Sequence, residues 1–297
     1  MKKVFIHIVI LLSLLLSNLA IAAPSRKASL VVDLNNGKIL HSENPHALRY
    51  PASLVKMMTL YITFKKLKNG ELSLNQKLKV SAKAASMPRL NIPLKAGSYI
   101  TVRKAILGVI VHSANDAAVV LAESIGGSEE KFAVMMNAQA KQLKMTNTTF
   151  RNASGMPHKQ QKSTAYDLAK LSIALKRDFP LYFPWFSVTS VAIDGKTFKS
   201  HNRVLLNYEW ATGLKTGFTN ASGFNLTTTA NKNGKNLVGV VLGEDTIKSR
   251  DSYMIHLLNS CFKKTDKNNS NSNNLVAKTE KTSITKNKSC KKTSAVQ

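Results

Sequence analysis

Hydrophobic positions follow two different periods along this chain, and the change of period separates strand-like from helix-like regions. Residues 28–44 contain two apolar-rich runs around an Asn-Asn-Gly turn at 35–37, which is the pattern of a β-hairpin. Residues 52–67 form a long apolar segment directly after Pro51 with no helix-breaking residue, and this predicts a helix. The chain therefore begins with two strands and continues with a helix.

Four further segments have the hydrophobic spacing of helices, and strands follow them. The helical segments cover residues 102–111, 116–125, 128–143 and 164–176. The β-favouring runs cover residues 186–193, 223–230 and 236–242, the last two joined by a turn at 231–234, and a closing amphipathic helix covers 250–262. This order predicts a mixed α/β (α+β) fold, in which an antiparallel sheet built from both chain ends is flanked by helices and carries an inserted all-α subdomain.

The first 22 residues have the composition of a secretory signal peptide. Two lysines precede an apolar run over residues 4–16, and an Ala-Ile-Ala cleavage site follows at 20–22. An uncleaved N-terminal membrane anchor is the alternative interpretation of the same run. We expect an exported, extracytoplasmic protein that starts near Ala23.

The other end of the chain predicts a disordered tail. Residues 263–297 are rich in Lys, Asn, Ser and Thr, and they contain too few apolar residues to offset the entropy of ordering them. The folded domain is therefore expected over residues 23–262. The two cysteines, Cys261 and Cys290, would have to pair across this tail, and the sequence leaves their pairing open.

The chain is strongly basic, which favours an anionic partner. The 297 residues include 43 Lys and Arg against 16 Asp and Glu, a formal net charge of +27, and residues 23–262 alone carry +18. Such a charge is typical of nucleic-acid binding, but export makes nucleic acid a poor partner. A secreted basic module that binds anionic cell-wall polymers is the non-enzyme hypothesis that the charge supports.

Among the sequence patterns that could support catalysis, one serine–lysine pair stands out. The chain has no metal-binding H-E-x-x-H or C-x-x-C pattern, no glycine-rich phosphate loop and no G-x-S-x-G elbow, so we expect neither a metal nor a cofactor. Ser53 and Lys56 lie three residues apart on the predicted helix, where the amine can act as general base for the hydroxyl. The same S-x-x-K spacing recurs at four other serines, but only Ser53 begins an apolar helix; the others are Ser128, Ser260, Ser283 and Ser289.

Two short motifs follow Ser53 in the chain. Ser113-Ala114-Asn115 lies between two predicted helices, and Lys215-Thr216-Gly217 leads into a predicted strand. Taken alone, each motif has a structural interpretation, as a capping turn or as a loop before a strand. Together with Ser53 and Lys56 they resemble the penicillin-recognising serine enzymes, which comprise the penicillin-binding proteins and the serine β-lactamases.

Longer stretches extend this resemblance to the D-alanyl-D-alanine carboxypeptidases, which are low-molecular-mass penicillin-binding proteins. The similar stretches are residues 30–37, 49–53, 152–156, 163–168 and 213–219. The resemblance implies a bacterial cell-envelope enzyme, in the periplasm or otherwise outside the cytoplasm, with its active site between the sheet and the helical subdomain. It implies a peptidoglycan stem peptide ending in D-Ala-D-Ala as substrate and β-lactams as covalent inhibitors.

The resemblance also implies the catalytic roles. Ser53 would be the nucleophile and Lys56 the general base, with its pKa lowered by burial and by Lys215. Ser113 would relay a proton to the departing D-alanine, and Asn115 would bind the substrate backbone and orient the base.

Substrate binding would fall to the strand that follows. Lys215 and Thr216 would hold the terminal carboxylate, and Gly217 would leave room for the substrate to lie along the strand edge. The backbone N–H groups of Ser53 and Phe218 would form the oxyanion hole. A polar segment at 201–203 lies where the family places basic residues near the carboxylate, and the sequence does not single out one of its residues.

Three related activities share these residues. A class A β-lactamase would need a loop glutamate, and the glutamates between the second and third motifs lack that loop sequence, so efficient β-lactam hydrolysis is not expected; they are Glu123, Glu129, Glu130 and Glu209. A DD-endopeptidase or a weak β-lactamase of the same superfamily stays open. The tail stands where many relatives have a second domain and a membrane-binding helix, which leaves membrane association open.

Overall fold

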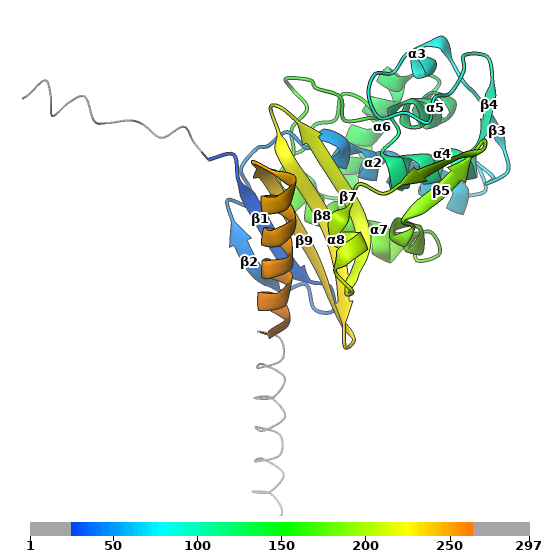
Figure 1. Ribbon diagram of the computed structural model, residues 1–297. Helices are drawn as coiled ribbons and strands as arrows, with labels where there is room; N and C mark the ends of the chain where they lie inside the picture. Colours follow the sequence, from blue (N-terminus) through cyan, green and yellow to red (C-terminus); the bar gives the residue numbers. More distant parts are fainter. Residues whose placement is uncertain (1–24, 264–297) are drawn as a thin grey trace, which may run out of the picture.

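The computed structural model describes residues 25–263 (Figure 1). The predicted signal peptide, the predicted tail and Cys290 lie outside the described residues, so these predictions and the limits of the folded domain remain predictions. Cys261 is buried. Within residues 25–263 no helix is long and apolar enough to cross a membrane.

The main sheet is built from both ends of the described chain, as predicted. Five antiparallel strands lie in the order β2-β1-β9-β8-β7. Their bounds are β1 Ala28–Asp33, β2 Ile39–Glu43, β7 Ala211–Thr219, β8 Gly223–Lys232 and β9 Lys235–Glu244. The predicted hairpins at residues 28–44 and 223–242 are therefore confirmed.

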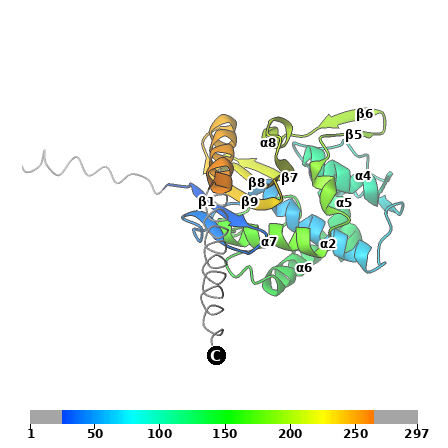
Figure 2. The ribbon, with the colours of Figure 1, turned by 90° about the horizontal axis from the view of Figure 1, so that it is seen from below.

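Helices cover both faces of the sheet. Successive residues of a strand point to opposite faces, so neighbouring residues of β1 enter different cores. In β1, Leu30 and Val32 belong to the main core, whereas Val31 belongs to a second core under the helix over residues 247–263. Figure 2 shows this helix on one side of the sheet and α7 (Ala165–Asp178) with α2 (Lys56–Lys68) on the other. The closing helix predicted at 250–262 is thus confirmed.

The predicted helices between the strands form the inserted subdomain and the central helix. They are α2, α4 (Val102–Leu107), α5 (Asn115–Gly126), α6 (Glu129–Gln142) and α7. Ser128 and Thr164 cap α6 and α7 through their side chains, which fixes where these helices start. α2 is buried on almost every face, in agreement with its uninterrupted apolar sequence.

Minor elements complete the described part. The helical subdomain includes α3 (Ala82–Ala85) and a two-stranded sheet of β3 (Lys77–Lys79) and β4 (Tyr99–Thr101). A second hairpin, β5 (Ser190–Ile193) with β6 (Lys196–Lys199), and the short α8 (Arg203–Asn207) precede β7.

Three predictions were only partly right. The strand expected over residues 186–193 is shortened to β5, because Phe183–Ser187 forms the 3₁₀ helix η3. In this helix the ring of Phe186 packs edge-on against that of Phe64, with the ring centroids 6.2 Å apart. The first residues of the predicted helix at 52–67 form a separate 3₁₀ turn, η1 (Ala52–Val55). The segment predicted at 102–111 ends in a π-helical turn, η2 (Gly108–His112).

Candidate active site

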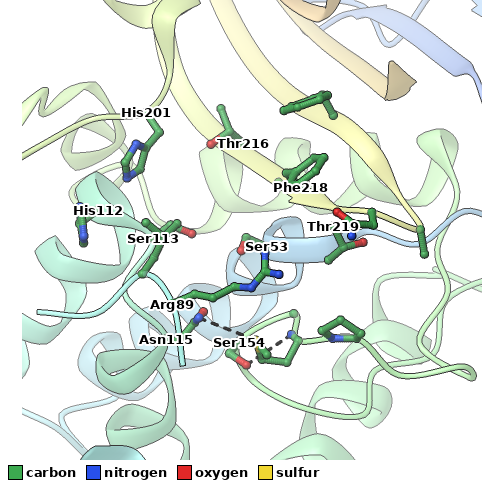
Figure 3. A pocket seen from close by; sticks show the side chains of 18 of the residues that line it. Ser53, Arg89, His112, Ser113, Asn115, Ser154, His201, Thr216, Phe218 and Thr219 are labelled. Atoms are coloured by element: carbon green, nitrogen blue, oxygen red, sulfur yellow. Dashed lines mark hydrogen bonds between the residues drawn. The ribbon is translucent and has the colours of Figure 1, made fainter. Parts of the chain in front are cut away.

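A cavity of about 850 Å³ lies between the helical subdomain and the edge of the sheet at β7 (Figure 3). Its lining includes Ser53 from η1, Ser113 and Asn115 from the η2–α5 junction, and Thr216 and Gly217 from β7. Three segments that are far apart in the sequence therefore bring all three motifs to one cavity.

Lys56 begins α2, three residues after Ser53, and is fully buried. Its Nζ atom lies 3.1 Å from Ser53 Oγ and 2.7 Å from Asn115 Oδ1, and it also donates to the backbone carbonyl of Ser154. A neutral amine has two N–H groups and one lone pair. Because Asn115 Oδ1 and the Ser154 carbonyl can only accept hydrogen bonds, they take the two N–H groups, and the lone pair is left to face Ser53.

The surroundings of Lys56 favour this neutral form. Burial lowers the pKa of Lys56 well below its ordinary value, and the positive charge of Lys215 lowers it further, whereas Asp116 raises it. Both lowering causes agree with what the family resemblance implies, and burial is the larger of the two. The lowered pKa favours the neutral form of Lys56, which is the form that can accept a proton.

The second motif sits in a strained turn. Ser113 adopts a left-handed backbone conformation with φ of 62° at the end of η2. Asn115 is held by the 86–94 loop, because its backbone N–H donates to Leu90 at 2.8 Å and its side chain donates to Pro88 at 2.9 Å. Ser113 Oγ is buried and has no hydrogen-bond partner among the described residues, so it can bind a substrate group.

The third motif lies on β7, the edge strand that borders the cavity. Lys215 is buried, and its Nζ donates to the Thr216 carbonyl at 3.0 Å. Burial and the charge of Arg250 lower the pKa of Lys215 to about 7. A Cβ on Gly217 would lie 3.0 Å from the backbone nitrogen of Ser53, so glycine lets β7 approach the serine segment closely.

Arg250 is a site residue that the sequence analysis did not identify. It lies in the first turn of the helix over residues 247–263, is only 3% exposed and lines the cavity beside the third motif. Its Nη2 atom lies 2.7 Å from an oxygen of Asp251. Arg250 is the first residue of the helix predicted over residues 250–262. No local sequence pattern indicates that the start of this helix lies beside Lys215 on β7.

The polar segment at 201–203 contributes one residue to the cavity. His201 lines it, and its ring packs against His112 with centroids 5.1 Å apart. Asn202 is buried and caps α8 by accepting from the N–H of Leu205, whereas Arg203 is exposed.

The other candidate residues lie elsewhere. The side chain of Ser128 caps α6, as an ordinary helix start does, and none of the four glutamates considered for β-lactam hydrolysis lines the cavity. Within residues 25–263 no group of three His, Cys, Asp or Glu side chains could hold a metal ion.

Comparison with known proteins gives consistent matches. The model of the D-alanyl-D-alanine carboxypeptidase family, peptidase family S11, matches residues 17–246. D-alanyl-D-alanine carboxypeptidase DacF of Bacillus subtilis is 31% identical over 245 residues, which cover 81% of this chain and 63% of that relative. The chain thus spans less than two thirds of the length of this relative.

Solved structures of similar proteins share the fold. The crystal structure of D-alanyl-D-alanine carboxypeptidase DacD from Francisella tularensis has a TM-score of 0.76 and 30% identity, covering 80% of this chain and 70% of that one. Penicillin-binding protein D2 from Listeria monocytogenes, in its ampicillin-bound form, has a TM-score of 0.70 and 32% identity, covering 81% and 99%. These similarities confirm the expected fold class. This chain belongs to the D-alanyl-D-alanine carboxypeptidase family.

Proposed function

We propose that this protein is a serine D-alanyl-D-alanine carboxypeptidase that removes the terminal D-alanine from peptidoglycan stem pentapeptides. One observation carries the proposal: the Nζ atom of the fully buried Lys56 lies 3.1 Å from Ser53 Oγ, and its other two partners are the acceptor oxygens of Asn115 and Ser154. Such a pair supplies a nucleophile and its base without a histidine or a metal. We infer the substrate, and the location of the protein outside the cytoplasm, from its membership of a family of cell-wall enzymes.

Acylation would use the groups around Ser53 in sequence. Ser53 Oγ attacks the carbonyl carbon of the last peptide bond while its proton passes to Lys56 Nζ. The backbone N–H groups of Ser53 and Phe218 stabilise the oxyanion. As the C–N bond breaks, Ser113 Oγ passes a proton to the departing D-alanine amine and regains one from Lys56.

Deacylation would repeat these steps with water. Lys56 takes a proton from a water molecule that attacks the ester carbonyl, and Ser53 Oγ takes that proton back as it leaves. The products are free D-alanine and a peptide shortened by one residue.

The basic groups beside β7 would bind the substrate carboxylate. Lys215 and Arg250 supply two buried positive charges, and Thr216 supplies a hydroxyl that faces the cavity. Charge-assisted hydrogen bonds of this kind are stronger than neutral ones. A free C-terminal carboxylate is what distinguishes a carboxypeptidase substrate, so this cluster supports that reaction class.

The stem peptide would lie along β7 as an added strand. β7 is the edge of the five-stranded sheet, and Gly217 presents no side chain to a ligand. A β-lactam would enter the same position and acylate Ser53.

Labelling with a fluorescent penicillin tests the proposal directly. We expect wild type and Ser128→Ala to take the label and Ser53→Ala to take none, because Ser128 has the same S-x-x-K spacing but caps a helix. Wild type should also release D-alanine from a stem pentapeptide. A wild-type chain that takes no label and releases no D-alanine overturns the proposal in favour of a basic wall-binding module. Cleavage of cross-linked dimers without D-alanine release would instead assign an endopeptidase.

A further inference from the structure

We infer that Glu129 is a positioning residue for the general base, because it anchors the segment whose carbonyl oxygen binds Lys56. This inference rests on the proposed function of Ser53 and Lys56. Glu129 does not line the cavity and contacts no reacting atom. It would act through the backbone of residues 153–154.

Glu129 makes a buried hydrogen bond at the start of α6. The residue is 7% exposed, and its Oε1 atom accepts the backbone N–H of Ala153 at 3.0 Å. Its other oxygen lies 3.0 Å from Lys83 Nζ. The carboxylate therefore joins α6 to the segment that precedes Ser154.

Residues 152–155 are held by several hydrogen bonds, which lie on both sides of Ser154. The Ala153 carbonyl accepts from Thr59 Oγ1 at 2.7 Å, and the Gly155 N–H donates to Asn152 Oδ1 at 2.7 Å. The carbonyl between them, that of Ser154, accepts from Lys56 Nζ. Glu129 supplies the α6 hydrogen bond nearest to this carbonyl; the other contacts of α6 with the segment lie four residues earlier, where Asn137 exchanges two hydrogen bonds with the backbone of Phe150.

The position of the Ser154 carbonyl decides where the Lys56 lone pair points. The ammonium form donates to all three oxygens, whereas in the neutral amine Asn115 Oδ1 and the Ser154 carbonyl take both N–H groups and the lone pair faces Ser53 Oγ at 3.1 Å. If Glu129 were truncated, the buried N–H of Ala153 would lose its partner and the segment would shift to satisfy it. One N–H group of Lys56 would then lose its acceptor, and the base would no longer be held toward the hydroxyl.

The hydrogen bond, and not the charge, is what this role needs. The charges that affect the pKa of Lys56 are those of Lys215 and Asp116, and Glu129 is not among them. Glutamine keeps an oxygen that can accept from Ala153, and Lys83 keeps Glu130 as a partner at 2.8 Å. Glutamine should therefore replace Glu129 with little loss of rate.

Glu130 is a matched control for this test. It is adjacent to Glu129 in the sequence and pairs with the same lysine, but its side chain is 75% exposed. We would compare wild type with Glu129→Ala, Glu129→Gln and Glu130→Ala, all as full chains. Stopped-flow acylation by a fluorescent penicillin separates the limiting rate from the dissociation constant, and thermal melts confirm that each variant is folded at the assay temperature.

We expect Glu129→Ala to lower the limiting acylation rate by about tenfold to a hundredfold, as small displacements of catalytic groups do, with an unchanged dissociation constant. Glu129→Gln and Glu130→Ala should react close to the wild-type rate. A folded Glu129→Ala chain with the wild-type rate overturns the inference, and so does a Glu129→Gln chain as slow as Glu129→Ala.

Two further outcomes keep the test decisive. If Glu129→Ala does not fold, Glu129→Asp retains the charge but draws the oxygen away from Ala153, and it must also lower the limiting rate. A wild-type rate in that variant overturns the inference. Wild type that takes no label removes the proposed function itself, whereas labelled wild type beside an unaffected Glu129 variant removes only the positioning role.

Discussion

Asn115 Oδ1 lies 2.7 Å from Lys56 Nζ, and this contact joins the helical subdomain to the segment that carries Ser53. Asn115 begins α5, whereas Lys56 begins α2, 59 residues earlier. The Lys56 amine is therefore oriented by a part of the fold other than its own helix. Movement of the subdomain against α2 would change the geometry of this amine.

Substitution of Asn115 should separate geometry from charge. In Asn115→Asp a carboxylate beside Lys56 favours the ammonium form and raises the pKa of Lys56, so the acidic limb of the acylation profile should move to higher pH. We expect a loss of about tenfold or more at pH 7, one pKa unit being about 1.4 kcal/mol, with recovery in alkaline buffer. Asn115→Ala should lose activity at every pH. Profiles of penicillin acylation against pH measure this, and superimposable profiles for Asn115→Asp and wild type would contradict it.

Titration of Lys215 should make kcat/KM for substrates with a free carboxylate fall at alkaline pH, which gives the pH profile an alkaline limb. Its pKa is lowered to about 7, so it is protonated below that pH and loses its charge above it. The kcat/KM for D-Ala-D-Ala peptides should therefore decline as pH rises above the neutral range, although a bound carboxylate raises the pKa of Lys215 in the complex. Lys215→Arg keeps its charge at these pH values and should flatten this limb. An unchanged limb in Lys215→Arg would assign it to another group.

Arg250 should matter for substrates with a free carboxylate. We expect Arg250→Ala to raise KM for a D-Ala-D-Ala peptide about tenfold to a hundredfold, the range for a lost hydrogen bond to a charged group. The same peptide with an amidated C-terminus should be affected much less. Lys248→Ala is the control, because Lys248 lies on the same helix but is exposed. Equal losses on the acid and the amide would exclude a carboxylate contact.

Two glycines allow the cost of backbone strain to be measured separately from the cost of a steric clash of an added Cβ. Gly155 and Gly195 have φ of 81° and 79°, but a Cβ would lie 2.1 Å from the Ala52 carbonyl oxygen at Gly155 and would meet nothing within 4 Å at Gly195. Gly195→Ala should cost about 1–2 kcal/mol of unfolding free energy from backbone strain. Gly155→Ala should cost a further 1–3 kcal/mol, roughly, from overpacking, and should reduce penicillin labelling by displacing Ser53. Urea unfolding midpoints measure both, and equal midpoints would contradict the collision.

Local patterns predicted most of the elements and the residues of the three motifs. The alternation around Asn35 and the continuous apolar run of α2 depend on local spacing, so they could be read before the fold was known. Phe186 could not be placed in this way, because a β-favouring aromatic residue is held in a 3₁₀ helix by its contact with Phe64.

The parts of the site that the sequence analysis missed lack a local signal. Residues 152–156 resemble the family in sequence, but no role follows from that resemblance, because the Ser154 carbonyl is a backbone group with no side-chain signature and Gly155 is informative only once it is seen against Ala52. Glu129 lies at the start of the helix predicted over residues 128–143, and that position gives no sign of its hydrogen bond to Ala153. Arg250 reaches the site through the packing of the last described helix on the sheet, which no short motif encodes.

The burial of Lys56 and Lys215 links folding to proton release. Both amines have lowered pKa values in the folded chain, whereas in the unfolded chain they titrate near 10.5. Between about pH 7 and 10.5 the unfolded chain therefore binds more protons through Lys215 than the folded chain does, and this residue makes folding more favourable as pH rises through that window. Lys56 acts in the same direction. The two amines that the proposed chemistry requires thus oppose folding most strongly in acidic surroundings, where other contacts must offset their cost.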